Sequence, residues 1–132
     1  MLYSVESGYI SKLPHLREYV VWRSRLTDID FASITDRLNE IIDQTGYGPE
    51  NEIVTSSWIP GSDWSETPFQ PIYNALGDVE LAAMFFGLIL MKVVMDRPHP
   101  EVFGVGRYEK DGAPIKGMTY YRLGNPPAPP KQ

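Results

Sequence analysis

The amino-acid sequence predicts an α+β fold, in which about four helices pack on a small, mainly antiparallel sheet. Two segments carry apolar side chains at helical spacing, residues 30–45 and residues 79–96. A third segment, residues 101–123, alternates around an Asp-Gly pair in the manner of a β-hairpin. We expect one globular α+β domain over residues 1–124, followed by a Pro-rich disordered tail over residues 125–132.

The first part of the chain predicts a short strand and then a helix. Residues 2–10, LYSVESGYI, have the composition of a strand. Residues 15–26 predict a helix with four residues along one stripe and two more beside it. The stripe consists of Leu16, Tyr19, Val20 and Arg23, and the neighbouring pair is Trp22 and Leu26.

The helix over residues 30–45 has the clearest amphipathic pattern in the chain. Its apolar face consists of Phe31, Ile34, Leu38, Ile41 and Ile42. Thr27 and Asp30 have the spacing of a capping box, and Asp28 and Asp30 are alternative N-caps. Gly46 is the expected C-terminal stop of this helix.

The middle of the chain predicts a strand and a short helix. Residues 52–59, EIVTSSWI, are rich in β-branched side chains, which favours a strand that ends at Pro60. In the helix that follows, Thr67 is the expected N-cap and Gly77 the expected stop. Pro71 is compatible with this helix because it still lies in the first turn.

A longer helix is expected over residues 79–96, with Asp78 as its N-cap. Residues 81–91 of this helix contain no charge, which raises the question of a membrane span. A span requires about 20 mostly apolar residues, whereas this run is short and is flanked by Glu80 and Lys92. We therefore predict that the helix forms the centre of the core and that the protein has no membrane segment.

The last structured segment predicts a β-hairpin. The Asp-Gly pair at 111–112 lies between two alternating runs and is typical of a two-residue turn. Such a turn sets the register of the two strands. Lys110 is then expected opposite Ala113, and Glu101 opposite Arg122, where the opposite charges favour pairing.

The same register places Gly104 opposite Thr119 and brings three glycines to one face of the hairpin. These glycines are Gly104, Gly106 and Gly117. In one interpretation the helix over residues 79–96 covers this face, with Gly87 at the crossing. In the other interpretation the glycines form the floor of a ligand pocket.

The composition limits the possible classes of function. The chain has no cysteine, which excludes disulfides, thiolate metal sites and cysteine nucleophiles. Its net charge of −5 disfavours binding to a phosphate backbone, and Lys92 is the one side chain in the long helix suited to reading bases. Residues 1–10 have neither the basic nor the apolar region of a signal peptide, so we expect a cytoplasmic protein.

No catalytic or metal-binding motif is evident, and we expect neither a metal nor a cofactor. The two histidines, His15 and His99, lack the spacing of a zinc site, and the chain contains neither a G-x-S-x-G elbow nor a P-loop. The best catalytic candidates lie on turns or strand positions: His99, Asp63, Glu66 and Arg107. The position of His99 between two prolines is more typical of a solvent-exposed loop.

Aromatic residues indicate a binding surface. Trp58 and Trp64 flank a Gly-containing turn, and Trp and Tyr often carry interface energy. With Asp63 and Tyr108 they are the candidate binding residues. Alternatively, Trp58 ends a buried strand and Trp64 braces the following helix. The tail contains a P-x-x-P-x-K pattern, typical of either a polyproline II ligand or a solvated terminus.

The leading functional hypothesis is a small soluble intracellular interaction or regulatory module, which acts by contact with an unidentified protein partner. The alternative is a small-molecule-binding protein or small enzyme with a pocket over the face of Gly104, Gly106 and Gly117. An interaction module requires an exposed apolar patch, whereas an enzyme requires polar groups that converge in a concavity. These two features distinguish the hypotheses.

Overall fold

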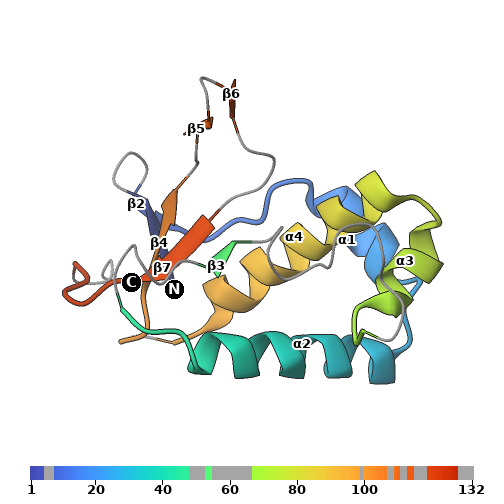
Figure 1. Cartoon of the computed structure of the whole chain (residues 1–132), viewed down its shortest axis with the longest axis horizontal. Coiled ribbons are helices and arrows are strands. Elements are labelled where there is room, and N and C mark those ends of the chain that lie inside the picture. Colours follow the sequence, from blue (N-terminus) through green and yellow to red (C-terminus); the bar gives the residue numbers. More distant parts are fainter. Residues whose placement is uncertain are drawn as a thin grey trace.

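The computed structural model describes residues 1–4, 8–47, 53–54, 67–98, 100–106, 109–110, 113–114 and 119–127. Over these residues the chain forms helices and short strands, which confirms the α+β class (Figure 1). The helices are α1 (Leu16–Arg23), α2 (Asp28–Asp43), α3 (Gln70–Leu76) and α4 (Val79–Asp96). The strands are β1 (Leu2–Ser4), β2 (Gly8–Ile10), β3 (Ile53–Val54), β4 (Phe103–Gly106), β5 (Glu109–Lys110), β6 (Ala113–Pro114) and β7 (Thr119–Arg122).

The described strands form a mixed sheet. Its order is β2-β1-β4-β7-β3, and β5 pairs separately with β6. β1 is parallel to β4, whereas the other neighbours are antiparallel. The expectation of a mainly antiparallel sheet is therefore corrected to a mixed sheet. The parallel pair arises because the chain passes through all four helices before Phe103 of β4 reaches Leu2 of β1.

The strand register agrees with the predicted hairpin next to the turn and differs from it further away. Lys110 pairs with Ala113 as expected. Gly104, however, pairs with Tyr121 rather than with Thr119. This difference is a shift of two residues, and a two-residue shift leaves every side chain on its expected face. The turn at 111–112 lies outside the described residues.

The start of α2 is set by Thr27. Its hydroxyl accepts a hydrogen bond from the backbone N–H of Asp30 at 3.0 Å, so Thr27 is the N-cap and the helix begins directly after it. The expected stop at Gly46 is wrong. The helix ends at Asp43, and Gln44 forms the C-cap in a right-handed conformation.

The N-cap of α4 and the C-cap of α3 agree with the prediction, whereas the N-cap of α3 does not. α4 has the expected bounds, and the carboxylate of Asp78 accepts from the N–H of Leu81 at 2.9 Å. α3 ends at Gly77, whose φ of +68° is a conformation that favours glycine. The N-cap of α3 is Phe69 rather than Thr67, so this helix begins later than expected.

α4 lies at the centre of the molecule, in contact with α1, α2 and α3 (Figure 1). Its buried side chains are Ala82, Phe85, Phe86, Leu88, Ile89, Leu90, Met91, Val93 and Val94. The inner face of the sheet adds Leu2, Phe103 and Tyr120 to the same apolar cluster. The predicted central position of this helix is confirmed. Among the described helices, none is long and apolar enough to cross a membrane.

α1 packs on α4 through two aromatic side chains. The rings of Tyr19 and Trp22 lie 6.0 Å and 5.7 Å, centroid to centroid, from the ring of Phe85. Leu16 and Val20, which share the predicted stripe with Tyr19, are exposed. The stripe therefore lies at the edge of the contact between α1 and α4 rather than at its centre.

Candidate functional site

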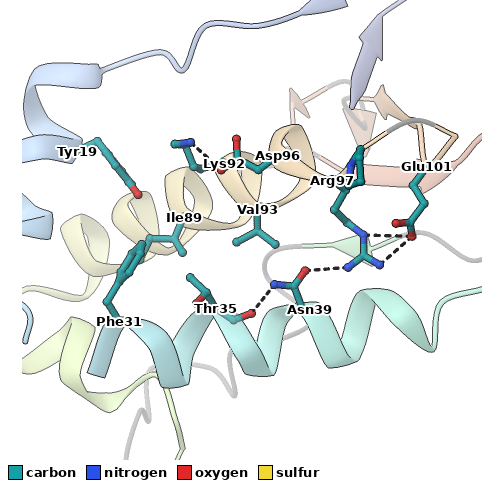
Figure 2. A pocket seen from close by; sticks show the side chains of 11 residues that line it. Tyr19, Phe31, Thr35, Asn39, Ile89, Lys92, Val93, Asp96, Arg97 and Glu101 are labelled. Carbon is teal, nitrogen blue, oxygen red and sulfur yellow. Dashed lines mark hydrogen bonds and ion pairs between the residues drawn. The ribbon is translucent and has the colours of Figure 1, made fainter. Parts of the chain in front are cut away.

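A groove with a volume of about 500 Å³ lies between α2 and α4. α1 closes one end through Tyr19, and the segment after α4 closes the other end (Figure 2). The lining residues are Tyr19, Phe31, Thr35, Asn39, Ile89, Lys92, Val93, Asp96, Arg97, Pro98 and Glu101. This volume is in the range of pockets that bind small molecules, about 300 to 1,000 Å³.

Helical spacing explains the composition of the groove walls. On α2, Phe31, Thr35 and Asn39 follow one another at intervals of four residues and therefore lie along one side of the helix. Ile89 and Val93 of α4 have the same spacing and face them (Figure 2). The groove is thus largely apolar around Phe31, Ile89 and Val93 and polar at the end that carries Asn39 and Arg97.

Arg97 occupies the polar end of the groove. Its Nη1 donates to Oδ1 of Asn39 at 2.8 Å, and its Nη2 donates to Oε1 of Glu101 at 2.8 Å (Figure 2). Nη2 also donates to the carboxylate of Asp43. These hydrogen bonds join the end of α2 to the end of α4. The Arg97 side chain is 12% exposed, so the bonds lie in a largely buried setting.

Arg122 of β7 extends this network to the sheet. Its Nη1 donates to the carboxylate of Glu101 at 3.0 Å, although Glu101 is not the cross-strand partner that was expected, because Arg122 lies opposite Phe103 in the register. Its Nη2 and Nε donate to the backbone carbonyls of Ile42 and Thr45 at 2.8 Å and 3.0 Å. The cation therefore satisfies carbonyls at the C-terminal end of α2, where the helix dipole also favours positive charge.

Glu101 provides the carboxylate to which both arginines donate hydrogen bonds. The hydrogen bond from Arg97 lowers the pKa of Glu101 below its ordinary value, and the bond from Arg122 acts in the same direction. Partial burial of the carboxyl opposes this shift. The carboxylate of Glu101 is therefore held in its ionised form as the link between α4 and β7.

The opposite end of the groove is less completely bonded. The Arg23 guanidinium lies 4.0 Å from the ring centroid of Phe31, and Lys92 Nζ donates to the carboxylate of Asp96 at 2.7 Å. Burial raises the pKa of Tyr19, and the charges of Lys92 and Arg23 oppose this increase. The hydroxyl of Tyr19 therefore lies in the field of two cations, Lys92 and Arg23, and of one anion, Asp96.

The bonding within the groove decides what its polar groups can do. At the Arg97 end, each guanidinium nitrogen and each partner is engaged within the network, which suits a role in holding helices together rather than in proton transfer. Among the described residues, no group of three His, Asp or Glu side chains comes together as a metal site would require. At the Tyr19 end, the Tyr19 hydroxyl bonds to no described residue, and Lys92 uses one of its three N–H groups in the bond to Asp96.

Most of the predicted site residues cannot be placed relative to the groove. Those outside the described residues are Trp58, Asp63, Trp64, Glu66, His99, Arg107 and Tyr108. The catalytic and binding roles suggested for them therefore remain predictions. The groove itself is built by other residues.

The predicted glycine face is described at Gly104. The nearest atoms to a Cβ built at Gly104 belong to the ring of Tyr121, with Cζ at 2.6 Å. The expectation that the long helix covers this position is wrong, because α4 packs on the opposite face, which carries Phe103. The tyrosine ring also fills the space that a ligand over Gly104 would need. Gly117 lies outside the described residues.

Sequence reasoning missed the Arg97 network and the position of Tyr19. Arg97 and Asn39 are 58 residues apart and lie on elements with no shared local pattern. A signal was present in the pair of Glu101 and Arg122, whose opposite charges pointed to one bond of this network. The other bonds depend on how α2 and α4 pack.

Comparisons with family models, with curated proteins and with solved structures found no match to this chain.

Proposed function

We propose that this protein acts by contact with another protein and that the outward face of α1 makes the contact. The observation that carries the proposal is the exposure of three aliphatic side chains on this eight-residue helix. Leu16, Val20 and Val21 are 56%, 58% and 51% exposed. Single exposed aliphatic residues are ordinary, whereas an apolar patch is typical of an interaction surface.

Helix geometry places these side chains together. Leu16 and Val20 are one turn apart, and Val21 lies beside Val20 on the side away from Tyr19 and Trp22. Tyr19 and Trp22 form the contact of α1 with α4, and the three aliphatic side chains lie outside that contact. Their burial by a partner would contribute roughly 25 cal/mol for each square ångström of apolar surface removed from water.

The charges around α1 indicate the chemistry of the partner. Lys12, Arg17 and Arg25 are exposed within or close in sequence to α1, which also carries the exposed Glu18, and among the described residues none of the three cations has an ion-pair partner. The whole chain carries a net charge of −5, so this basic surface differs in sign from the rest. We infer that the partner presents an amphipathic segment with apolar residues flanked by Asp and Glu.

The saturated bonding of the Arg97 network favours this function over catalysis. A catalytic acid or base must be able to exchange a proton with a substrate. The Glu101 carboxylate already accepts bonds from two arginines, and Asn39 is bonded through both its amide groups. Exposed aliphatic surface is the feature that distinguishes an interaction module.

A photo-crosslinking amino acid at Val20 tests the proposal in extracts of the source cells. The matched control carries the same group at Ile29, an aliphatic residue of α2 that is 83% exposed. We expect a partner that crosslinks from position 20 and not from position 29, and whose crosslinked peptide contains apolar residues flanked by Asp or Glu. The Val20→Asp and Leu16→Asp variants should lose this partner, while Ile29→Asp keeps it.

Two outcomes would contradict the proposal. One is the same crosslinked proteins from positions 20 and 29, which would show that the outward face of α1 has no special role. The other is binding to phosphatidylserine vesicles that depends on Leu16 and Val20, with no protein partner. A basic amphipathic helix on an anionic lipid surface would explain that result instead.

A further inference from the structure

Tyr19 has a hydroxyl group that faces the groove and lacks a hydrogen-bond partner among the residues that the structure describes. The side chain is 8% exposed, and its recorded interactions are the edge contact of its ring with Phe85 and the charges around it. A hydroxyl group that faces a groove and has no protein partner is available to bond a molecule in that groove, either water or a ligand.

The hydroxyl points into the groove. Figure 2 shows Tyr19 reaching from α1 toward Phe31 and Ile89, with its oxygen at the tip. The nearest polar group along α4 is Lys92, whose charge lowers the pKa of Tyr19 against the effect of burial. The Lys92 ammonium gives one hydrogen bond to Asp96 and so has two N–H groups left.

These donors favour an oxygen acceptor that carries a negative charge. The O–H of Tyr19 and the remaining N–H groups of Lys92 can both donate to one carboxylate. The charge of Arg23 also acts on this position. Asp96, which lines the groove and pairs with Lys92, offsets part of this positive charge. The preference for a carboxylate therefore rests on the available O–H and N–H donors, and a purely apolar ligand would make no bond to them.

The walls beside these donors are apolar. Phe31 of α2 and Ile89 of α4 lie at the Tyr19 end of the groove, and Val93 of α4 follows toward the Arg97 end (Figure 2). The volume of about 500 Å³ leaves room for more than a carboxylate group. A ligand that fits therefore has a charged end for Tyr19 and Lys92 and an aliphatic or aromatic body for the apolar walls.

We propose that the groove between α2 and α4 binds a small organic monocarboxylate with an apolar body, held by the Tyr19 hydroxyl and the Lys92 ammonium. The site is separate from the outward face of α1, since Tyr19 lies on the opposite side of that helix from Val21. Ligand binding and partner binding can therefore be tested independently.

The test uses hexanoate and phenylacetate as probes, with hexanamide and phenylacetamide as uncharged controls of the same shape. Binding is measured by calorimetry and by chemical-shift changes in the backbone amide spectrum. We expect the two carboxylates to bind at least about tenfold more tightly than the amides. The largest shift changes should fall on the groove, at Tyr19, Phe31, Thr35, Ile89 and Val93.

Two variants identify the donors. Tyr19→Phe removes the hydroxyl and keeps the ring, and we expect it to weaken carboxylate binding about tenfold. Lys92→Gln should weaken it about threefold or more and reduce its dependence on salt. Tyr73→Phe is the matched control, because Tyr73 is a half-buried tyrosine of α3 that does not line the groove. It should bind both probes as the parent protein does.

Three results would overturn the proposal. Equal affinity for the carboxylates and their amides would show that charge is not recognised. Unchanged binding by folded Tyr19→Phe would show that the hydroxyl makes no bond to the ligand. Shift changes outside the groove, or none at a probe concentration of about 10 mM, would exclude the site. If Tyr19→Phe failed to fold, Lys92→Gln would decide the question, because the Lys92 side chain is half-exposed.

Discussion

The ring of Tyr121 on β7 lies directly over the α-carbon of Gly104 on β4. A Cβ at position 104 would stand 2.6 Å from Cζ and 2.9 Å from the hydroxyl oxygen of that ring. The two residues are register partners in the antiparallel pair. Glycine is therefore required here for close approach, and the ring covers backbone that would otherwise be open to solvent.

The first prediction concerns this contact. Gly104→Val should lower the free energy of unfolding by about 1–2 kcal/mol, because the Tyr121 ring must swing away to admit the new side chain. In a chain that already carries Tyr121→Ala, the same substitution should be neutral or stabilising, since valine favours strands. Urea unfolding of the four proteins measures the coupling. Equal effects in both backgrounds would show that the ring does not confine position 104.

The second prediction concerns Arg97. Arg97→Met should lower the free energy of unfolding by about 2–3 kcal/mol, because Glu101 and Asn39 lose partners in a largely buried setting. Arg97→Lys keeps the positive charge but cannot make the same set of guanidinium hydrogen bonds, so its loss of stability should be smaller than that of Arg97→Met. The control is Arg37→Met, which removes an exposed ion pair with Glu40 and should cost about 0–1 kcal/mol. Similar losses for the two Met variants would contradict the structural role of Arg97.

The third prediction is a dependence on pH through Glu101. Its pKa is lowered in the folded protein from an ordinary value of 4.5. A carboxylate of this kind stabilises the fold above its unfolded pKa, and the contribution disappears as the pH falls through the lower, folded pKa. The stability difference between the parent protein and Glu101→Gln should therefore shrink between pH 7 and pH 3. A difference that stays constant over this range would indicate that Glu101 is not held ionised by the arginines.

The fourth prediction compares two leucines of α4. Leu88 is buried in the core, whereas Leu81 is partly exposed in the first turn of the helix. Leu88→Asp should prevent folding, because it places an unpaired carboxylate in the apolar cluster. Leu81→Asp should change stability little, since a carboxylate near a helix N-terminus is favourable. Circular dichroism and thermal melts distinguish the outcomes. A native melt for Leu88→Asp would show that α4 is not central.

Local signals account for the parts of the fold that were predicted correctly. α4 was placed with its observed bounds because Asp78 caps one end, Pro98 follows the other, and the side chains between them are almost all apolar. Thr27 was recognised as a possible cap for the same reason. Each of these signals depends on neighbours within a few residues.

The orientation of α1 could not be read from periodicity. The helix carries apolar side chains on several of its sides, so Leu16 and Val20 are alternatives to Tyr19 and Trp22 for burial against the core. The aromatic rings are buried there, because their burial removes more apolar surface from water. The exposed aliphatic face, on which the proposed function depends, follows from that preference.

The groove depends on contacts between elements distant in sequence. Asn39 meets Arg97 only because α2 packs along α4. Likewise, the register expected from the Asp-Gly pair holds for Lys110 and Ala113 but not for Gly104. Further along the strands, the fit of Tyr121 over Gly104 accompanies a shift of two residues. Neither effect has a signature in the local sequence.

The position of β1 between β2 and β4 has a consequence for the order of folding. β1 pairs with its neighbour β2 nearby in the chain, but its pairing with β4 joins Leu2 to Phe103. Closing so long a loop is entropically costly, and non-local pairings of this kind slow folding. Helices form from local contacts and can therefore form before β1 pairs with β4. Until β1 arrives, one edge of β4 remains unpaired and open to strands of other chains, so the interval before this pairing is when the protein is most prone to aggregate.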